Sequence, residues 1–337
     1  MNRGRLVGIA AITVTSVLWG TTGTAATFAP GAGPLAIGSA ALGIGGLLQA
    51  VIAVPALRAE RTALCAQRWI VIIGAVAVAI YPLAFYSSMH SAGVAVGSVV
   101  SLASAPLASG ILERVVDRRP LSRWWMLAAA LGAIGSTLLC VAKIEGRTCS
   151  AFDTALGIAL GLVAGITYAT YSWASHRLMS GGISRGASMA AVFGGGGLLL
   201  IPVLVLTGAS LLDSGQNIAV TAYMALVPMF LGYLLFGYGL TKASASTATT
   251  VTLTEPAIAT VLAVLIVGER LTALGWAGLV VIAGVLVILA LAPTNADPIS
   301  DAAEISRRRS PESAARADKA QTEGGKPAVD ASVASPR

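Results

Sequence analysis

Charged side chains are scarce in this sequence. Only 11% of its 337 residues are Asp, Glu, Lys or Arg, whereas 56% are hydrophobic. A soluble domain carries about 25% charged residues. This scarcity excludes an ordinary soluble globular domain and indicates an integral membrane protein.

The residue patterns of several enzyme classes are missing as well. The sequence has no HExxH motif and no Walker phosphate-binding motif, and its two histidines and three cysteines do not stand at metal-ligand spacings. No lysine in the apolar segments is placed to activate a serine. We therefore expect a protein that is not an enzyme, is not driven by ATP, and carries neither a cofactor nor a metal.

Long apolar runs, by contrast, recur along nearly the whole chain. A helix needs about 20 apolar residues to cross the roughly 30 Å hydrocarbon core of a bilayer. The two-residue alternation of a membrane β-barrel is missing, so the runs predict an all-α integral membrane protein. The ten predicted transmembrane helices are residues 6–25, 35–56, 68–88, 93–113, 123–142, 155–176, 188–207, 217–240, 245–267 and 272–292. The first run, which follows Arg3 and Arg5, also has the layout of a cleaved signal peptide, although the repeat described below needs it as a helix.

The composition changes abruptly after residue 293. Residues 294–337 are polar, charged and rich in Ala, Ser and Pro, with no aromatic residue. Such a segment cannot bury enough apolar surface to fold, which predicts a disordered cytoplasmic tail. Its RRRS run at 307–310 either contacts anionic lipid headgroups or is modified, or it only anchors the end of the last helix.

The net charge of +7 follows the membrane topology and does not indicate nucleic-acid binding. If the N-terminus is inside, the inner loops hold twelve Lys and Arg residues and the outer loops hold three. The positive-inside rule then places both termini in the cytoplasm, and we expect the plasma (inner) membrane and no nucleic-acid partner. The inner set is Arg3, Arg5, Arg58, Arg61, Arg68, Arg114, Arg118, Arg119, Arg123, Arg177, Arg185 and Lys242, and the outer set is Lys143, Arg147 and Arg270.

The two halves of the chain repeat each other. Residues 101–139 align with residues 251–289, so that Pro106 meets Pro256 and Leu121-Ser122 meets Leu271-Thr272. We expect a first five-helix repeat at 1–145 and a second at 146–293. Because five is odd, the second copy enters the membrane from the opposite side. Inverted repeats of this kind build carriers that open a central site to one side at a time.

Three pieces of the sequence resemble the EamA-type ten-helix carriers of the drug/metabolite transporter superfamily. They are LWGTTG at 18–23, SAPLASGILERVVDRRPLSRWWMLAAALGAIG at 104–135 and TEPAIATVLAVLIVGERLTALGWAGLVVIAGV at 254–285, and the similarity covers residues 5–292. The resemblance implies a secondary carrier with cytoplasmic termini, often an exporter of amino acids or related metabolites. In the first half VVDRRP replaces the usual GE, so no role is assigned to Glu113 or Asp117.

Glu255 and Pro256 stand together near the middle of the predicted helix 245–267. An ionised side chain at this depth costs roughly 2.5–3.5 kcal/mol, so it needs a polar surrounding. Pro256 has no N–H and leaves carbonyls near Thr252 without partners, and Pro106 is expected to break its helix in the same way. The functional interpretation is that Glu255 and Thr252 belong to a substrate or proton site. The structural interpretation, given equal weight, is that Glu255 is protonated and bonds a neighbouring helix.

Several aromatic residues are further candidates for the site. Rings with a polar tip stack on or hydrogen-bond small metabolites, but they also form belts at the membrane interface. Only two or three of them are therefore expected to contact a substrate. His90 is considered as an outer gate or, alternatively, as an ordinary interfacial histidine. The aromatic candidates are Trp19, Tyr81, Tyr86, Tyr168, Tyr171, Tyr233 and Tyr238.

The predicted function is secondary active transport, most simply export, of small metabolites such as amino acids by alternating access around a midplane cavity. Two alternatives stay open, a multidrug or cationic-compound exporter of the same superfamily and a membrane scaffold or sensor that transports nothing. A channel is disfavoured because it would need a filter loop or a ring of charges. The expected partners are a small-molecule substrate, the lipid bilayer and, as coupling ion, protons. The oligomeric state is not predicted.

Overall fold

The computed structural model describes residues 3–29, 31–92, 94–118, 120–141, 150–262 and 272–291. Within these ranges every regular element is helical and no strand occurs. The all-α prediction is therefore confirmed. The tail predicted at 294–337 lies outside the described residues, and so does the boundary predicted between the two repeats at 145–146.

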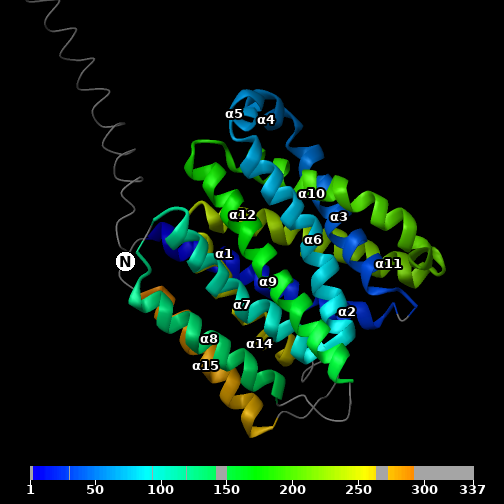
Figure 1. Ribbon diagram of the computed structural model, residues 1–337, viewed down its shortest axis with the longest axis vertical. Helices are drawn as coiled ribbons and strands as arrows, with labels where there is room; N and C mark the ends of the chain where they lie inside the picture. The colour runs from blue at the N-terminus through cyan, green and yellow to red at the C-terminus, as the bar shows by residue number, and fades with distance from the viewer. Residues whose placement is uncertain are drawn as a thin grey trace, which may run out of the picture. The chain divides into compact units, whose positions relative to one another are not determined.

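The helices follow one another along the chain as Figure 1 labels them. The first part contains α1 (Arg3–Gly20), α2 (Thr22–Thr27), α3 (Pro34–Ile52), α4 (Val54–Ala59), α5 (Arg61–Ala66), α6 (Arg68–Ala92), α7 (Val94–Val115) and α8 (Arg123–Val141). The second part contains α9 (Ala151–Ser180), α10 (Arg185–Thr207), the 3₁₀ helix η1 (Gly208–Leu212), α11 (Gly215–Met224), the π-helix η2 (Ala225–Leu231), α12 (Gly232–Leu240), α13 (Ala245–Val251), the 3₁₀ turn η3 (Thr252–Thr254), α14 (Glu255–Leu262) and α15 (Ala273–Leu291).

Helices cover at least part of every predicted segment. Among the described residues, seven helical stretches are long and apolar enough to cross a membrane, and Ala273–Leu289 is a shorter apolar helix. The number of ten membrane spans stays a prediction. The seven stretches are Gly4–Ala26, Pro34–Ile52, Arg68–Ala92, Val96–Val115, Ala151–Ser180, Arg185–Leu212 and Gly215–Leu240.

Two parts of the chain differ from the predicted helices. The segment predicted at 35–56 ends at Ile52, and the short helices α4 and α5 lead on to α6. The segment predicted at 217–240 contains the π-helical stretch η2 between α11 and α12. Pro228 lies inside η2 and has no N–H for the regular helical ladder. The indole N–H of Trp19 donates to the Pro228 carbonyl at 2.9 Å, so a side chain from α1 satisfies this irregular backbone.

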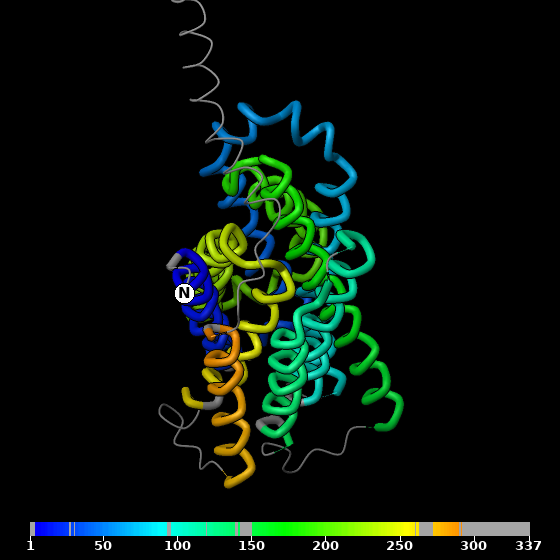
Figure 2. Tube along the Cα trace, turned by 90° about the vertical axis from the view of Figure 1, so that its left-hand side faces the viewer, coloured from blue at the N-terminus to red at the C-terminus, as the bar shows by residue number. Residues whose placement is uncertain are grey.

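Two groups of helices stand on either side of the centre. In the first, α9 packs along both α6 and α7, and we call this the α6–α7–α9 bundle. In the second, α1 packs along α12, α13 and α14, and we call this the α1–α12–α14 bundle. Figure 2 shows α1, in blue, next to the yellow helices of its bundle. Outside the two bundles, α3 packs on α10 and α8 lies along α15 (Figure 1).

The helix directions define two ends of the molecule. At one end α6 finishes and α3 and α9 begin, and we call it the mouth end. At the opposite end α7, α9 and α12 finish and α10 and α13 begin. Every Lys and Arg of the described residues lies at the opposite end, in the connections or the adjoining helix turns. The predicted asymmetry of positive charge thus coincides with an axis of the bundle.

Small residues allow α9 to approach its neighbours closely. Gly157, Gly161 and Gly165 follow one another at four-residue intervals, which places them on one face of the helix. A Cβ atom added at Gly165 would lie 2.6 Å from the backbone oxygen of Ser101 in α7. No side chain fits there, so the glycine is needed for the contact between α9 and α7.

We expect Gly165→Val to lower the melting temperature of the detergent-solubilised protein by several degrees. The added methyl groups overpack the contact between α9 and α7, and overpacking costs about 1–3 kcal/mol. Gly284→Val in α15 is the matched control, because a Cβ atom there meets no other atom within 4 Å. Equal melting of the two variants would show that the α9 face tolerates a side chain and that the packing argument is wrong.

Candidate functional site

A cavity of about 820 Å³ lies between the two bundles. Its walls come from α1, α2 and α14 on one side and from α6, α7 and the start of α9 on the other, and the first turn of α3 adds Pro34 and Ile37. Exposed residues at the mouth end, among them His90, Ser150 and Asp153, belong to its lining, and the buried Trp19 lies at its inner limit. The cavity therefore leads from the surface at the mouth end to the middle of the protein.

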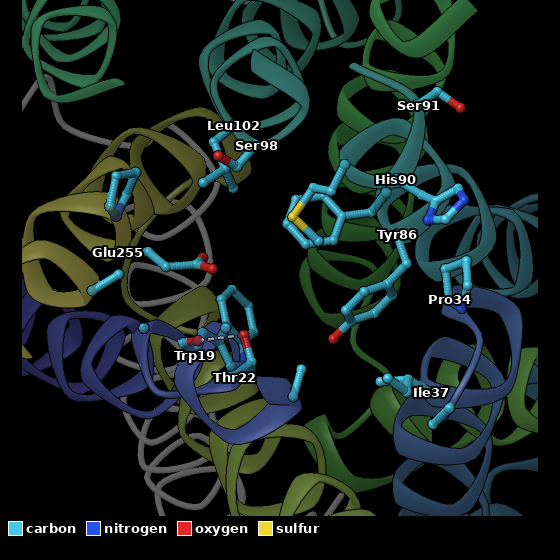
Figure 3. Close-up of a pocket in the computed structure, with 18 of the residues that line it drawn as sticks. Trp19, Thr22, Pro34, Ile37, Tyr86, His90, Ser91, Ser98, Leu102 and Glu255 are labelled. Carbon is cyan, nitrogen blue, oxygen red and sulfur yellow. Dashed lines mark hydrogen bonds between the residues drawn. The ribbon is translucent and has the colours of Figure 1, made fainter. Parts of the chain in front are cut away.

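Glu255 lies at the inner part of this cavity, where a helix is interrupted. The helix α13 ends at Val251, a 3₁₀ turn covers Thr252–Thr254, and α14 begins at Glu255. Figure 3 shows the carboxyl group of Glu255 pointing into the open space. The break predicted at Pro256 is thus present, and it directs the Glu255 carboxyl group into the cavity.

Threonine hydroxyls satisfy the carbonyl groups around the break. The Thr252 hydroxyl donates to the Thr249 carbonyl at 2.9 Å, and the Thr254 hydroxyl donates to the Val251 carbonyl at 2.8 Å. Both bonds reach back three residues, which matches the tighter turn of a 3₁₀ helix. The polar sequence TTVTLT before Glu255 therefore stabilises the irregular backbone in an apolar part of the protein.

The break predicted at Pro106 is wrong. Pro106 lies inside α7, which continues without interruption from Val94 to Val115. A proline removes one N–H donor, and a membrane helix tolerates this loss when neighbouring groups satisfy the freed backbone. In α7 the serines bond carbonyls of their own helix, for example Ser101 to Gly97 at 2.7 Å. The aligned prolines of the two halves therefore have different local structures.

Aromatic residues from both bundles form part of the cavity wall. Trp19 of α1 and Tyr86 of α6 line it from opposite sides, and Figure 3 shows the Tyr86 hydroxyl group directed into the space. Phe85 packs edge-on against Tyr86, with ring centroids 5.4 Å apart. His90, one turn beyond Tyr86, lines the cavity near its mouth. Of the predicted site residues, Glu255, Trp19, Tyr86 and His90 are thus brought together.

The charged groups of the lining are acidic. Glu255 and Asp153 contribute carboxyl groups, His90 contributes an imidazole, and no Lys or Arg is found among the described residues that line the cavity. Hydroxyl groups of Thr22 and Ser98 add neutral polar sites.

The remaining predicted tyrosines, apart from Tyr238, form the closed floor of the cavity. Tyr168 and Tyr171 of α9 and Tyr233 of α12 are at most 1% exposed. The Tyr171 and Tyr233 hydroxyls bond each other at 2.8 Å, and the Tyr168 hydroxyl bonds Thr252 at 2.7 Å. Tyr81 packs against Tyr168 and Tyr171 with ring centroids 5.6 Å away. These rings and hydrogen bonds connect the two bundles just beyond the cavity.

A small pocket of about 20 Å³ extends from the cavity into this floor. It shares Trp19, Tyr86 and Glu255 with the cavity and adds Tyr81 and Tyr233. This volume is enough for about one water molecule. Tyr81 and Tyr233 thus lie near the site without lining its main space.

Tyr238 lies away from the cavity. It belongs to the last turns of α12 at the opposite end, and the guanidinium group of Arg185 stands over its ring at 5.7 Å from the centroid. The prediction that Tyr238 belongs to a substrate site is therefore wrong. The helix was chosen correctly, but Tyr238 stands five residues beyond Tyr233 and thus more than one turn further from the centre.

Sequence reasoning missed several residues that the cavity brings together. Asp153 is one, although the pattern Ser150-x-x-Asp153 predicts a capped helix start: the Ser150 hydroxyl accepts from the Asp153 N–H at 3.1 Å. Phe85 is another: it is 7% exposed and lines the cavity beside Tyr86, but an apolar ring in an apolar run gives no signal in the sequence. Glu113 and Asp117 were left without a role, yet Glu113 is buried, the Asp117 side chain is only 7% exposed, and both carboxyl groups accept hydrogen bonds.

One enzyme-like pattern was also overlooked in the sequence. Residues 182–186, GISRG, have the GxSxG spacing of a serine-hydrolase nucleophile turn. That motif requires a preceding strand, whereas Ser184 follows α9 and is the N-cap of α10. Its hydroxyl accepts from the Ala187 N–H, and its own N–H donates to Glu60 at 2.8 Å. The segment is therefore a helix start.

Among the described residues, no group of three His, Cys, Asp or Glu side chains is arranged as metal ligands would be.

Comparison with known proteins agrees with these features. A sequence profile described as the EamA-like transporter family matches residues 155–291. The chain is 34% identical to the uncharacterised transporter YwfM of Bacillus subtilis over 287 aligned residues. The alignment covers 84% of this chain and 93% of that protein. An uncharacterised transporter of Clostridium kluyveri is also 34% identical, over 119 residues that cover 34% of this chain and 38% of that protein.

A solved structure has the same fold. A crystallised protein superposes with a TM-score of 0.69 at 17% sequence identity, covering 86% of this chain and 96% of its own. At this identity the likeness concerns the fold alone. The family profile and the near full-length relative agree with each other and with the helical membrane architecture, and from them we conclude that this chain belongs to the EamA-like transporter family.

Proposed function

We propose that this transporter is a secondary carrier, an exporter of amino acids or related small metabolites that works by alternating access around the cavity at Glu255. The observation that carries the proposal is a cavity open at one end, with a carboxyl group at a helix break on its inner wall. Its volume of about 820 Å³ falls in the range of about 300–1,000 Å³ typical of small-ligand pockets. Rocking of the two bundles closes the mouth and opens the opposite end.

The helix contacts support an inverted repeat of residues 1–145 and 146–293. The third helix of each predicted repeat is α6 in the first and η2–α12 in the second, and the first helix is α1 or α9. Exchanging the repeats therefore turns the contact of α6 with α9 into the contact of α12 with α1, and both occur. It turns the contact of α6 with α10 into that of η2 with α3, which also occurs. The pairs α3–α10 and α8–α15 map onto themselves. This pairing is what a two-fold relation between the halves requires.

The charge distribution supports an orientation. All Lys and Arg residues of the described ranges lie at the end opposite the cavity mouth. Under the positive-inside rule that end faces the cytoplasm, with both chain termini, and the mouth faces outward across the plasma (inner) membrane.

For an amino acid substrate, Glu255 binds the ammonium group and His90 or a wall hydroxyl binds the carboxylate. Trp19, Phe85 and Tyr86 surround the apolar side chain. Protons serve as the coupling ion, and Glu255 is the group that exchanges a proton for the substrate ammonium. The other titratable side chains that line the cavity or its small pocket are Tyr81, Tyr86, His90, Asp153 and Tyr233.

A specific observation favours a second candidate, the export of organic cations. The lining holds two carboxyl groups and no Lys or Arg within the described residues, and three aromatic rings stand on its walls. Aromatic faces attract cations within about 6 Å. A cation without a carboxylate satisfies this lining without needing His90 at all.

We expect Glu255→Gln to reduce efflux of the labelled substrate at least tenfold and to remove its dependence on the proton gradient. The amide neither holds a full negative charge nor exchanges a proton, and a hydrogen bond to a charged group contributes about 1.5–3 kcal/mol. Efflux from cells with matched membrane levels measures the effect. If folded yield falls in parallel with activity, Glu255 is a structural residue that bonds a neighbouring helix.

The identity of the substrate follows from a panel of amino acids, purines and aromatic cations in the same efflux assay. We expect competition among substrates that carry an ammonium group, because each uses Glu255. His90→Ala then separates the two candidates: it weakens amino acid efflux severalfold if His90 binds the carboxylate, and it leaves cation efflux unchanged. Absence of efflux for every compound would contradict the carrier proposal.

Two tyrosine variants distinguish the role of a residue in the cavity wall from that of a residue in its floor. Tyr171→Phe breaks the buried bond to Tyr233 and leaves that hydroxyl without its partner, so we expect the free energy of unfolding to fall by about 1–3 kcal/mol. Tyr86→Phe removes a hydroxyl that points into the cavity, so we expect altered apparent substrate affinity with unchanged melting temperature. Melting curves and efflux of both variants check this, and the reverse pattern would place the substrate in the floor.

A further inference from the structure

Hydrogen bonds between the two bundles are concentrated on one side of the cavity. From the floor toward the opposite end, Tyr168 bonds Thr252, Tyr171 bonds Tyr233, and the His176 ring bonds the Leu240 carbonyl at 2.9 Å. In each case α9 of the first bundle meets the second bundle. The opposite end is therefore held shut by a series of polar contacts, whereas the mouth end contains the cavity.

Glu113 makes the strongest contact of this series. It lies in the last turn of α7 and is 6% exposed. One carboxyl oxygen accepts the backbone N–H of Ser246 at 2.9 Å, and the other accepts the Ser246 hydroxyl at 2.6 Å. Hydrogen bonds to a carboxylate are roughly twice as strong as bonds between neutral groups. Among the described contacts that join the bundles here, this is the one with a carboxyl group.

Two further hydrogen bonds hold the first turns of α13, one at Ser246 and one at Thr249. The indole N–H of Trp125 in α8 donates to the Ser246 carbonyl at 3.0 Å. One turn along, the Thr249 hydroxyl donates to the Ser109 hydroxyl of α7 at 3.2 Å. The first turn of α13 is thus attached to α7 and α8 through Glu113, Trp125 and Ser109.

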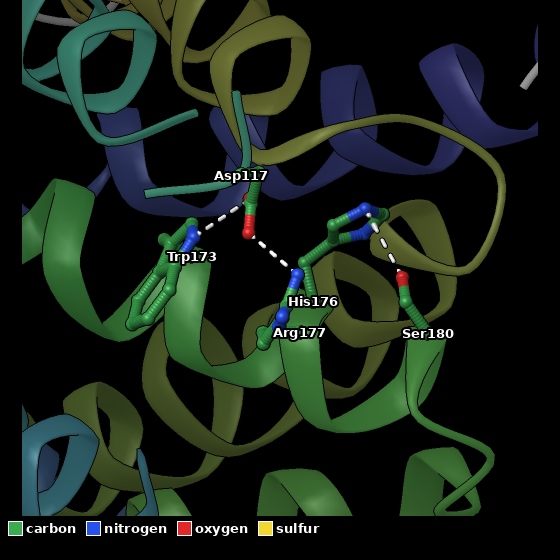
Figure 4. A network of polar contacts seen from close by, with 5 residues as sticks. All are labelled: Asp117, Trp173, His176, Arg177 and Ser180. Atoms are coloured by element: carbon green, nitrogen blue, oxygen red, sulfur yellow. Dashed lines mark hydrogen bonds and ion pairs between the residues drawn. The ribbon is translucent and has the colours of Figure 1, made fainter. Parts of the chain in front are cut away.

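The end of α7 is itself fixed, so Glu113 is presented from a rigid position. Asp117, just beyond α7, accepts Trp173 Nε1 at 2.9 Å and Arg177 Nη1 at 2.7 Å. Figure 4 shows both α9 side chains converging on this carboxyl group. Asp117 therefore ties the end of α7 to α9, and separation of α7 from α13 must break the bonds of Glu113.

Because α13 is joined to α14 by only the turn Thr252–Thr254, it forms the far half of the broken helix that carries Glu255. We propose that Glu113 is the latch of the closed end: its bonds to Ser246 hold α13 against α7 and keep the transporter open at the mouth, and they release when the cavity opens to the opposite side. This rests on the proposed alternating access. Glu113 is a positioning residue, since it acts through α13 and does not line the cavity.

Cysteine labelling tests the latch without any transport assay. The full-length chain with Cys65, Cys140 and Cys149 replaced by Ser is purified into lipid nanodiscs and treated with a water-soluble maleimide. Ser175→Cys reports the closed end: it is fully buried one turn beyond Tyr171, and its hydroxyl has no hydrogen-bond partner among the described residues, so the replacement breaks no bond. Ala259→Cys, in α14, reports the mouth of the cavity.

We expect Glu113→Gln to raise the labelling rate at Ser175→Cys about fivefold or more, because the charged hydrogen bonds become neutral. Labelling at Ala259→Cys stays the same or falls. The matched control is Glu60→Gln, because Glu60 also accepts a serine N–H at a helix start, at 2.8 Å from Ser184, but on the surface and away from α13. We expect the control to change neither rate. If Glu113→Gln does not fold, Ser246→Ala removes one of the two bonds and is expected to act in the same direction.

Two results overturn the proposal. Unchanged labelling at Ser175→Cys would mean that Glu113 does not hold the end closed. A parallel rise at both reporters would mean that the substitution only loosens the packing. Because no substrate is present, a failure of the efflux assays leaves this experiment unaffected, and a negative labelling result leaves the carrier proposal standing.

Discussion

Pro256 has no N–H to donate, and it stands in an apolar part of the protein where water does not replace a missing donor. An unsatisfied backbone group in hydrocarbon costs several kcal/mol, so the chain before the proline cannot remain a regular α-helix unless other groups supply bonds. The Thr252 carbonyl accepts the Glu255 N–H instead, which makes a 3₁₀ turn, and the hydroxyls of Thr252 and Thr254 bond the carbonyls of Thr249 and Val251. Glu255 then becomes the first residue of a new helix whose side chain faces the cavity.

The same constraint explains why the floor is polar although it is buried. The Thr252 hydroxyl donates to the Thr249 carbonyl and also bonds the Tyr168 hydroxyl, so it gives that buried phenol a partner. Tyr168 in turn belongs to a set of aromatic rings that fill the centre and bring Tyr171 against Tyr233. The broken helix, the aromatic floor and the cavity above it therefore depend on one another, and substitution of any one is felt by the other two.

The helices are predicted well because each one corresponds to a long, continuous run of apolar residues in the sequence. A run of about 20 apolar residues has few alternatives to a helix in or near a membrane, and the break at Pro256 follows from a missing donor beside several hydroxyls. Pro106 has the same missing donor, yet α7 continues as a regular helix from Val94 to Val115. Whether a proline bends a helix is decided by neighbouring helices, which a single sequence does not reveal.

The residues of the candidate site and of the proposed latch were predicted less completely, for a related reason. Glu255, Trp19 and Tyr86 were found because a carboxyl group or a polar ring in an apolar run is conspicuous. Glu113 was not found, because at the end of a helix a carboxyl group is ordinary, and its burial results from a contact with Ser246, which is 133 positions away in the sequence. Tyr238 is the opposite case, because it was assigned to the site although it lies away from the cavity. Its helix α12 also carries Tyr233 of the floor, but Tyr238 stands near the end of that helix, beside Arg185.

The broken helix also provides a physical connection between Glu255 and Glu113. Eight residues lie between Ser246 and Glu255, and most of them are buried. A rigid helix would carry any displacement at Glu255 directly to its other end, whereas the turn at 252–254 lets α14 adjust to an occupant before α13 moves. Under the proposed mechanism this order matters, because a carrier that released its closed end whenever the cavity was empty would change sides without a proton and lose its coupling. In that proposal the Glu113 carboxyl group of α7 holds α13, and the three-residue turn separates α13 from Glu255, so the binding energy of an occupant must break two charged hydrogen bonds before the opposite end opens.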